Sequence, residues 1–316
     1  MRQPSTQTKP ELSTAALIYE YGGSEQLRVE KIEIGLPGPG EVRVRVAAAA
    51  VNPFDINLRQ GFLQAFVPLV FPACLGSDVS GIVDAVGEGV VGLVPGDQVI
   101  GMLTTGAYSQ WAITQASLLV ILPDGIDLCH AAALPTGVLT GVQLIERGLK
   151  PRAGSKVLVA GAGGSVGRAA VFAAKDLGAL VYAGIRPGSR DAVADLPVAG
   201  VIDLSDDVAL QAAGPFDYVA DTVGGGVAER LFAHLSASGY FASTVLPFIN
   251  PPADAIERFT PVIVEFDGPR LQRFARELVA KGRKILVSSV LNLADVAQAH
   301  VLLARGGLQG KIVLKP

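Results

Sequence analysis

Cysteine is nearly absent from this chain: Cys74 and Cys129 are the only two among 316 residues. Two thiols without the short spacing of a metal-binding pair exclude a disulfide-stapled fold and indicate a reducing compartment. Histidine is also scarce, and His130, His234 and His300 are spread along the sequence. They indicate packing or surface roles and no catalytic or metal-binding cluster.

The chain also has no excess of positive charge and lacks an apolar run long enough to cross a membrane. The net charge is −3 and no helix carries a basic stripe, so nucleic acid is not an expected partner. The uncharged stretch at residues 131–145 is interrupted by proline and glycine. It is shorter than the roughly 18 residues of a membrane-spanning helix. Residues 1–12 lack the apolar core of a signal peptide and predict a loose tail. We therefore expect a cytoplasmic protein without a membrane partner.

Glycine, by contrast, is abundant, with 37 residues, and the most informative glycines lie in KVLVAGAGGSVG at residues 156–167. An apolar run at 157–160 predicts a strand, and a helical pattern at 168–177 follows the glycine turn. Strand, glycine turn and helix is the order of a dinucleotide-binding site, because backbone amides can then approach a pyrophosphate. Taken alone, the turn is also compatible with another kind of α/β unit.

More predicted strands follow the glycine turn and alternate with helical segments. They cover residues 180–184, 200–204, 217–221 and 239–244. This alternation is typical of a doubly wound parallel sheet, and it favours the dinucleotide site over the alternative.

The end of the second predicted strand indicates which dinucleotide is bound. NAD sites carry an acidic residue there for the ribose hydroxyls, whereas this chain has Arg186, Ser189 and Arg190 before its first carboxylate, Asp191. Guanidinium groups bind phosphate through paired, charge-assisted hydrogen bonds. We expect NADPH to be preferred over NADH. The alternative is that both arginines lie in a solvated surface loop.

Upstream of about residue 125 the pattern changes to short strands separated by Gly/Pro turns. Residues 41–46 alternate, with Val42, Val44 and Val46 on one face and Arg43 and Arg45 on the other. Similar runs at 81–86, 98–100 and 110–114 predict a barrel-like β domain. The strand-like end at 311–314 predicts a return to this domain. We therefore expect domains at 1–125 plus 263–316 and at 126–262.

Several segments together resemble the medium-chain dehydrogenase/reductase superfamily, in its zinc-independent quinone oxidoreductase branch (zeta-crystallin-like). The matching stretches occur in the family's order. They are residues 51–55 (VNPFD) with Arg59 and Gly61, 76–83 (GSDVSGIV), 86–87, 95–99 (PGDQV), 106–111 (GAYSQW), 131–134 with Thr140, the glycine turn, 221–225 (DTVGG) and 310–314 (GKIVL).

The resemblance implies an α/β protein with a GroES-like β-barrel domain, a Rossmann domain and an active site in the cleft between them. It also implies hydride transfer from NADPH to a quinone or an electron-poor C=C bond, and a homodimer. Zinc-dependent members place Cys, His and Cys where this chain has Asn52, Ser77 and Thr136. None of these is a good zinc ligand, so we expect no metal.

Without a metal, hydrogen bonds must polarise the substrate oxygen. Asn52 is the expected donor, and Asp55, three residues on, is expected to orient Asn52 or to handle a proton. The alternatives are a turn residue before Pro53 and a helix cap. The expected cofactor-binding residues are Thr140, Gly161, Gly163, Gly164, Ser165, Val166, Gly167, Arg186, Ser189, Arg190, Thr222, Val223, Thr244, Leu246 and Lys311.

Three functions fit the sequence. The first is an NADPH-dependent quinone or enone reductase. The second keeps the fold but reduces an enoyl thioester in fatty-acid or polyketide synthesis, for which a basic patch would be needed to receive an acidic carrier protein. The third is a low-turnover NADPH-binding sensor or structural protein, because a tyrosine that relatives often carry near the substrate is absent around Phe62 and Phe66.

Overall fold

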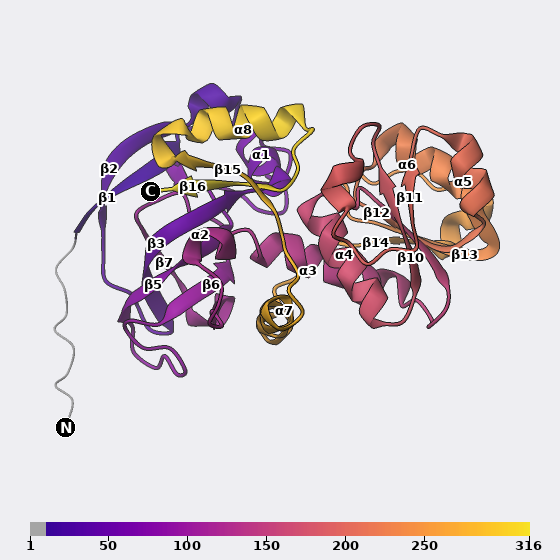
Figure 1. Ribbon diagram of the computed structural model, residues 1–316. Coiled ribbons are helices and arrows are strands. Elements are labelled where there is room, and N and C mark those ends of the chain that lie inside the picture. The colour runs from indigo at the N-terminus through magenta and orange to yellow at the C-terminus, as the bar shows by residue number, and fades with distance from the viewer. Residues whose placement is uncertain (1–10) are drawn as a thin grey trace. The chain divides into compact units, whose positions relative to one another are not determined.

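The computed structural model describes residues 11–316 (Figure 1). The described chain divides into two compact units. The first unit contains the chain up to Thr136 together with Phe266–Pro316, and the second unit is Gly137–Glu265. No helix in this part of the chain is long and apolar enough to cross a membrane.

The first unit is built on a seven-stranded sheet and a three-stranded sheet. The order in the large sheet is β15-β16-β3-β5-β6-β8, with β7 on β3, and in the small sheet β2-β1-β4. Strand bounds are β1 Glu11–Ile18, β2 Arg28–Ile34, β3 Glu41–Val51, β4 Ala73–Cys74, β5 Asp78–Val86, β6 Gln98–Met102, β7 Trp111–Gln115, β8 Leu119–Ile121, β15 Val287–Asn292 and β16 Lys311–Lys315.

The two chain ends meet in this unit, because β16 pairs antiparallel with β3. The predicted return of the C-terminal strand is thereby confirmed. The expected tail at 1–12 needs a correction, since β1 already begins at Glu11 and pairs with β2 along its length. Alternation of Ala16 and Ile18 into the core explains why this segment is strand. Residues 1–10 lie outside the described part.

Four α-helices belong to the first unit: α1 Pro53–Arg59, α2 Leu128–Ala131, α7 Gly268–Ala280 and α8 Val296–Arg305. The sequence begins α1 sharply, because Pro53 occupies its first turn and Asn52 is the N-cap residue. Leu58 of α1 and Val296 and Ala299 of α8 are buried in the same apolar core as the valines of β3. This packing fixes α1, and with it the residues at its N-terminus, against the sheet.

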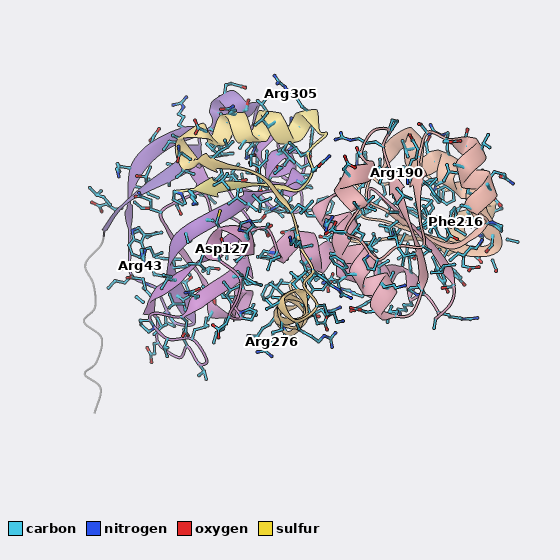
Figure 2. All side chains as sticks on the ribbon, in the orientation of Figure 1. Arg43, Asp127, Arg190, Phe216, Arg276 and Arg305 are labelled. Atoms are coloured by element: carbon cyan, nitrogen blue, oxygen red, sulfur yellow. The ribbon has the colours of Figure 1, made fainter. Side chains whose placement is uncertain are left out.

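The prediction for Arg43 is wrong. Val42, Val44 and Val46 are buried as expected, but Arg43 is also fully buried, while Arg45 is exposed. Register shifts in the pairing of β3 with β5 interrupt the simple alternation next to Arg43. Its guanidinium binds Asp84 at 2.6 Å, donates to the Gly35 carbonyl at 3.2 Å and lies over the Trp111 ring (Figure 2).

Arg43→Ala is expected to lower the free energy of unfolding by about 2–4 kcal/mol, because it leaves the Asp84 carboxylate without its buried cation. Chemical denaturation of the purified protein measures this loss. Arg45→Ala is the matched control from the same strand, and its exposed side chain predicts a change within about 0.5 kcal/mol. Equal effects of the two substitutions would contradict the structural role of Arg43.

The second unit is a six-stranded parallel sheet with the order β11-β10-β9-β12-β13-β14. Its strands are β9 Lys156–Ala160, β10 Leu180–Ile185, β11 Gly200–Asp203, β12 Phe216–Asp221, β13 Leu235–Ser243 and β14 Phe259–Pro261. All five strands predicted in this region are present, which confirms the doubly wound sheet. Phe216, which Figure 2 labels, and Phe241 are fully buried in its core.

The helices around this sheet are α4 Ser165–Asp176, α5 Asp207–Ala213 and α6 Gly225–Leu231. α3 Pro135–Gln143 enters the unit at Gly137 and continues as a π-helical segment, η3 Leu144–Leu149. The 3₁₀ segments of both units are η1 Ser24–Gln26, η2 Ala116–Leu118, η4 Arg190–Val193, η5 Phe232–His234, η6 Ala253–Arg258 and η7 Leu293–Asp295.

Candidate active site

The glycine turn of the second unit joins the end of β9 to the start of α4. Gly161 follows the strand with a φ of +79°, a conformation that favours glycine. Gly164 is the N-cap residue of α4. A Cβ on Gly167 would overlap the Gly161 carbonyl oxygen and lie 2.7 Å from the carbonyl carbon. The turn and the helix therefore approach each other as closely as the dinucleotide fingerprint requires.

The residues expected at the cofactor gather at one edge of this sheet. Ala160, Asp221 and Ser243 are aligned across neighbouring parallel strands, so the segments that follow them leave the sheet at the same edge. Thr222 continues from β12 and donates its hydroxyl to the Ala160 carbonyl at 2.7 Å. Thr244 follows β13 and donates its N–H to the Asp221 carbonyl at 3.2 Å. This edge is where parallel α/β sheets bind nucleotides.

Asp221 is a positioning residue that the sequence reasoning did not single out. It is fully buried, and its Oδ1 accepts the N–H groups of Val223 and Gly224 at 2.9 and 3.0 Å. Its Oδ2 accepts the Ser243 hydroxyl at 2.6 Å. One carboxylate therefore fixes the turns after β12 and β13. A buried aspartate at the end of a predicted strand, just before Thr222-Val223-Gly224, was the available signal.

Thr140 reaches this unit on α3. The next residue, Gly141, packs against the first turns of α4: a Cβ there would lie 2.8 Å from the Ala169 Cβ and the Ala170 nitrogen. Thr140 itself is buried. The close helix–helix approach at Gly141 therefore brings Thr140 near the N-terminal half of α4, and its contact with a cofactor stays a prediction.

The expected phosphate-binding residues lie directly after β10. Arg186 is exposed, and its Nε donates to the Ser189 hydroxyl at 2.9 Å. Arg190 is also exposed and donates to the Val201 carbonyl at 3.5 Å. Arg168 of α4, fully buried, binds the Ala192 carbonyl and Asp195 and so anchors the segment after Arg190. Arg186 and Ser189 are brought together, and the backbone that carries them is held in place.

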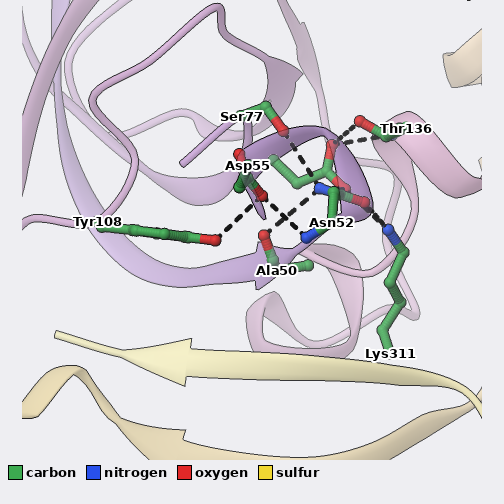
Figure 3. Close-up of polar contacts among 8 residues, drawn as sticks. Ala50, Asn52, Asp55, Ser77, Tyr108, Thr136 and Lys311 are labelled. Carbon is green, nitrogen blue, oxygen red and sulfur yellow. Dashed lines mark hydrogen bonds and ion pairs between the residues drawn. The ribbon is translucent and has the colours of Figure 1, made fainter. Parts of the chain in front are cut away.

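The first unit holds a second polar cluster, in which Asn52, Ser77, Thr136 and Lys311 lie close together (Figure 3) around the Asp78 carboxylate. The Asn52 Nδ2 donates to Asp78 Oδ2 at 3.0 Å and to the Ser77 hydroxyl at 3.2 Å. Thr136 donates its hydroxyl and its N–H to Asp78 Oδ1, at 2.5 and 2.9 Å. Lys311 of β16 donates to Asn52 Oδ1 and lies 3.5 Å from Asp78 Oδ2. Three positions chosen by resemblance alone are therefore neighbours.

Asn52 and Asp55 are both buried, at 1% and 0% exposure. Asp55 occupies the third position of α1, and its Oδ2 accepts the backbone N–H of Asn52 at 2.8 Å and the Tyr108 hydroxyl at 3.0 Å. Burial, as the largest cause, and the charge of the nearby Asp78 raise the Asp55 pKa to about 7, against the lowering effects of the Asn52 and Tyr108 hydrogen bonds and of the Lys311 charge. The arrangement supports the expectation that Asp55 orients Asn52.

The donor set of this cluster does not fit zinc. Zinc prefers thiolate, imidazole and carboxylate ligands, usually three or four of them, whereas the carboxylates of Asp78 and the nearby Asp55 are the two such groups in this cluster. Among residues 11–316, no group of three or more His, Cys, Asp or Glu side chains is placed to hold a metal ion. The glycine turn, by contrast, fits a dinucleotide, because Gly163 and Gly164 carry no side chains that could cover the backbone at a helix N-terminus.

A parallel sheet with a dinucleotide-type glycine turn, joined to a mainly antiparallel unit with a buried polar cluster, defines a nucleotide-dependent oxidoreductase fold. Comparison with known families agrees. The family described as "Alcohol dehydrogenase GroES-like domain" matches residues 38–124, and the family described as "Zinc-binding dehydrogenase" matches residues 196–314.

Characterised relatives differ in how much of their length is matched. The chain is 33% identical to the quinone oxidoreductase of Rattus norvegicus over 58% of this chain and 56% of that protein, so it spans about half the length of this relative. It is 30% identical to the trans-enoyl reductase tazE of Aspergillus terreus, over 85% of this chain and 96% of that protein. It is 31% identical to the NAD(P)H oxidoreductase RTN4IP1, mitochondrial, of Homo sapiens, over 99% of this chain and 91% of that protein.

Solved structures give the same fold. The quinone oxidoreductase from Coxiella burnetii superposes with a TM-score of 0.85 over 97% of this chain and all of that one, at 24% identity. The chain belongs to the medium-chain dehydrogenase/reductase superfamily of oxidoreductases, with quinone oxidoreductases among its relatives.

Proposed function

We propose that the protein is an NADPH-dependent reductase that transfers hydride, without a metal, to a quinone or an α,β-unsaturated carbonyl compound. The observation that carries the proposal is the glycine turn at Gly161–Gly167, with Arg186 and Ser189 at the end of the adjacent strand. Relatives named as quinone oxidoreductase and NAD(P)H oxidoreductase support it. Family analogy also predicts a homodimer, which sedimentation would test.

Each group of residues has a separate part in this function. The glycine turn and the N-terminus of α4 hold the pyrophosphate, and the Thr222–Val223 and Thr244–Leu246 segments, fixed by Asp221, surround the nicotinamide. When bound, the reduced nicotinamide supplies a hydride, and water or a protein group supplies the proton. The protein contributes positioning and polarisation of the acceptor.

Asn52 and Asp55 act together in this proposal. Both amide hydrogens of Asn52 are directed to Asp78, Ser77 and the Ala50 carbonyl, and its oxygen accepts from Lys311. The amide is therefore better placed to orient its neighbours than to meet a substrate directly. Asp55 in turn fixes the backbone of Asn52 through the N-terminal turn of α1.

The function is tested by following NADPH oxidation with a panel of acceptors. We expect turnover with benzoquinones or with simple enones, measured as loss of absorbance at the reduced nicotinamide band. Tight NADPH binding with no turnover on any acceptor would contradict the proposal and support a sensor or structural role. The panel also contains a crotonyl thioester.

Reduction of enoyl thioesters is the second candidate, because the trans-enoyl reductase tazE matches nearly over its full length. Delivery by an acidic carrier protein would need a basic surface. Of the two arginines of β3, Arg43 is fully buried and bound to Asp84, so only Arg45 is exposed. The small quinone or enone is therefore the preferred acceptor, and faster turnover of the crotonyl thioester would reverse that order.

Arg186→Ala is expected to weaken NADPH binding about 10- to 100-fold while changing NADH binding little, because one charge-assisted hydrogen bond is worth about 1.5–3 kcal/mol. Fluorescence titration of both nucleotides measures the change. Arg152→Ala is the control, an exposed arginine in the same unit. A wild-type protein that binds the two nucleotides equally would contradict the proposed preference.

A further inference from the structure

The Lys311 ammonium is nearly buried, with 8% of its side chain exposed. β16 pairs with the end of β3, so Lys311 lies beside Asn52, the residue between β3 and α1 (Figure 3). β5, which begins with Asp78, pairs with β3 along its other edge. A buried charge is costly unless it is paired and hydrogen-bonded. Here Asp78 supplies the opposite charge and Asn52 the acceptor oxygen, so the cation is held in a fixed position.

The polar atoms of Asp78 and Asn52 are already engaged within the cluster. Asp78 accepts from Asn52, Lys311 and twice from Thr136, and the Asn52 amide uses its oxygen and its nitrogen. An ammonium has three N–H donors, and residues 11–316 supply acceptors for two of those on Lys311. The third N–H is the donor that the cluster leaves for a ligand.

The Lys311 ammonium lies where the residues of this chain do not fit the zinc site that the matched family's description names. A family described as "Zinc-binding dehydrogenase" matches the region that includes Lys311. The positions where zinc-dependent members carry ligands, Asn52, Ser77 and Thr136, instead surround an Asp78–Lys311 ion pair. At these positions the chain therefore has a fixed positive charge, the Lys311 ammonium, in place of metal ligands.

We propose that the Lys311 ammonium is a catalytic residue that binds the acceptor oxygen in place of a metal ion. The proposal rests on the proposed reductase function. As hydride forms the new C–H bond, the electron pair of the acceptor's π system moves to its oxygen. The third N–H of Lys311 stabilises this oxyanion, and water then donates the proton. Asn52 and Asp78 are positioning residues, because they hold the ammonium.

The test compares Lys311→Met, Lys311→Ala and Lys311→Arg with the wild type on the acceptor that it reduces best. Removal of an oxyanion donor costs about 100- to 1,000-fold in kcat, so we expect this loss for Lys311→Met and a smaller one for Lys311→Arg. Since Asn52 and Asp78 hold Lys311, the proposed role replaces the cofactor contact that the sequence led us to expect, and NADPH affinity, measured by fluorescence, should stay within about twofold. Lys315→Met, on the same strand and exposed, is the control that should retain full activity.

Chemical rescue separates the ammonium from a packing role. In Lys311→Ala, added ethylammonium should restore kcat at least about tenfold and with saturation, whereas ethanol of similar size should not. Rates are normalised to NADPH-binding sites, so that only folded protein is counted. Loss of NADPH affinity parallel to the loss of kcat, or equal rescue by ethanol, would overturn the proposal. A wild-type chain without turnover would instead refute the reductase function itself.

Discussion

Gly167→Ala is expected to lower the free energy of unfolding by about 3 kcal/mol, at the upper end of overpacking effects, and to abolish measurable NADPH binding. The new methyl group would overlap the Gly161 carbonyl oxygen and lie 2.7 Å from its carbonyl carbon. Both are backbone atoms, so no side-chain rotation relieves the overlap. The helix must move away from the turn, and the amides that would hold the pyrophosphate move with it. Chemical denaturation and fluorescence titration measure the two losses.

Two other glycines separate folding from cofactor binding. Gly164→Ala adds a methyl group at an ordinary 3.5 Å from the Gly161 oxygen. This variant should fold like the wild type yet bind NADPH about tenfold more weakly or worse, because the methyl occupies the close approach to the pyrophosphate. Gly226→Ala, which meets nothing within 4 Å, should change neither property. NADPH binding by Gly167→Ala at wild-type affinity would refute the assignment of the glycine turn.

The second unit could be predicted from the sequence in detail because its information is local. Strands β9 and β10 are short apolar runs, and glycine or polar residues bound them within a few positions. β14, Phe259–Pro261, has no such pattern and was not predicted. The turn after β9 carries its own constraints, since Gly161 has a positive φ and Gly167 leaves no room for a Cβ against the Gly161 carbonyl. Such patterns need no knowledge of distant partners.

The first unit was harder to predict because its decisive contacts are distant in sequence. Lys311 and Asn52 are 259 residues apart, and no local pattern reveals that β16 returns beside β3 with this register. Arg43 shows the same limit: alternation placed it outside, but Asp84, 41 residues further on, and Trp111 provide a buried partner and a ring. Local periodicity cannot predict that a charged side chain is buried when its partners are distant in sequence.

The free energy of unfolding, measured as a function of pH, should show whether Asp55 is protonated in the folded protein. Its pKa is raised from an ordinary 3.8 to about 7, chiefly by burial. A raised carboxyl pKa means that the folded protein holds a proton which the unfolded chain releases between about pH 4 and 7. The contribution of Asp55 to stability is therefore present at pH 4 and is lost as the pH rises towards 7, by up to about 1.4 kcal/mol per pKa unit.

Other groups near Asp55 must be separated from this effect. Tyr108 hydrogen-bonds to it, and Asp78 and Lys311 act through their charges. His300 lies edge-on to the Tyr108 ring, and burial together with Arg59 lowers its pKa to about 3. Because a depressed histidine pKa makes stability rise between about pH 3 and 6.5, it opposes the Asp55 slope. The useful quantity is consequently the difference between the wild type and a variant at Asp55.

Asp55→Asn is expected to remove the Asp55 slope, because an amide does not titrate, while its oxygen can still accept from Asn52 and Tyr108 at every pH. Relative to the wild type, the variant should gain stability steadily between pH 4 and 8, by about 2–4 kcal/mol in total. Urea denaturation at a series of pH values measures the gain, with Asp124→Asn, an exposed aspartate of the same unit, as control. A stability difference that does not change with pH would mean that Asp55 stays ionised in the fold, so that the charge of Lys311 outweighs burial at this site.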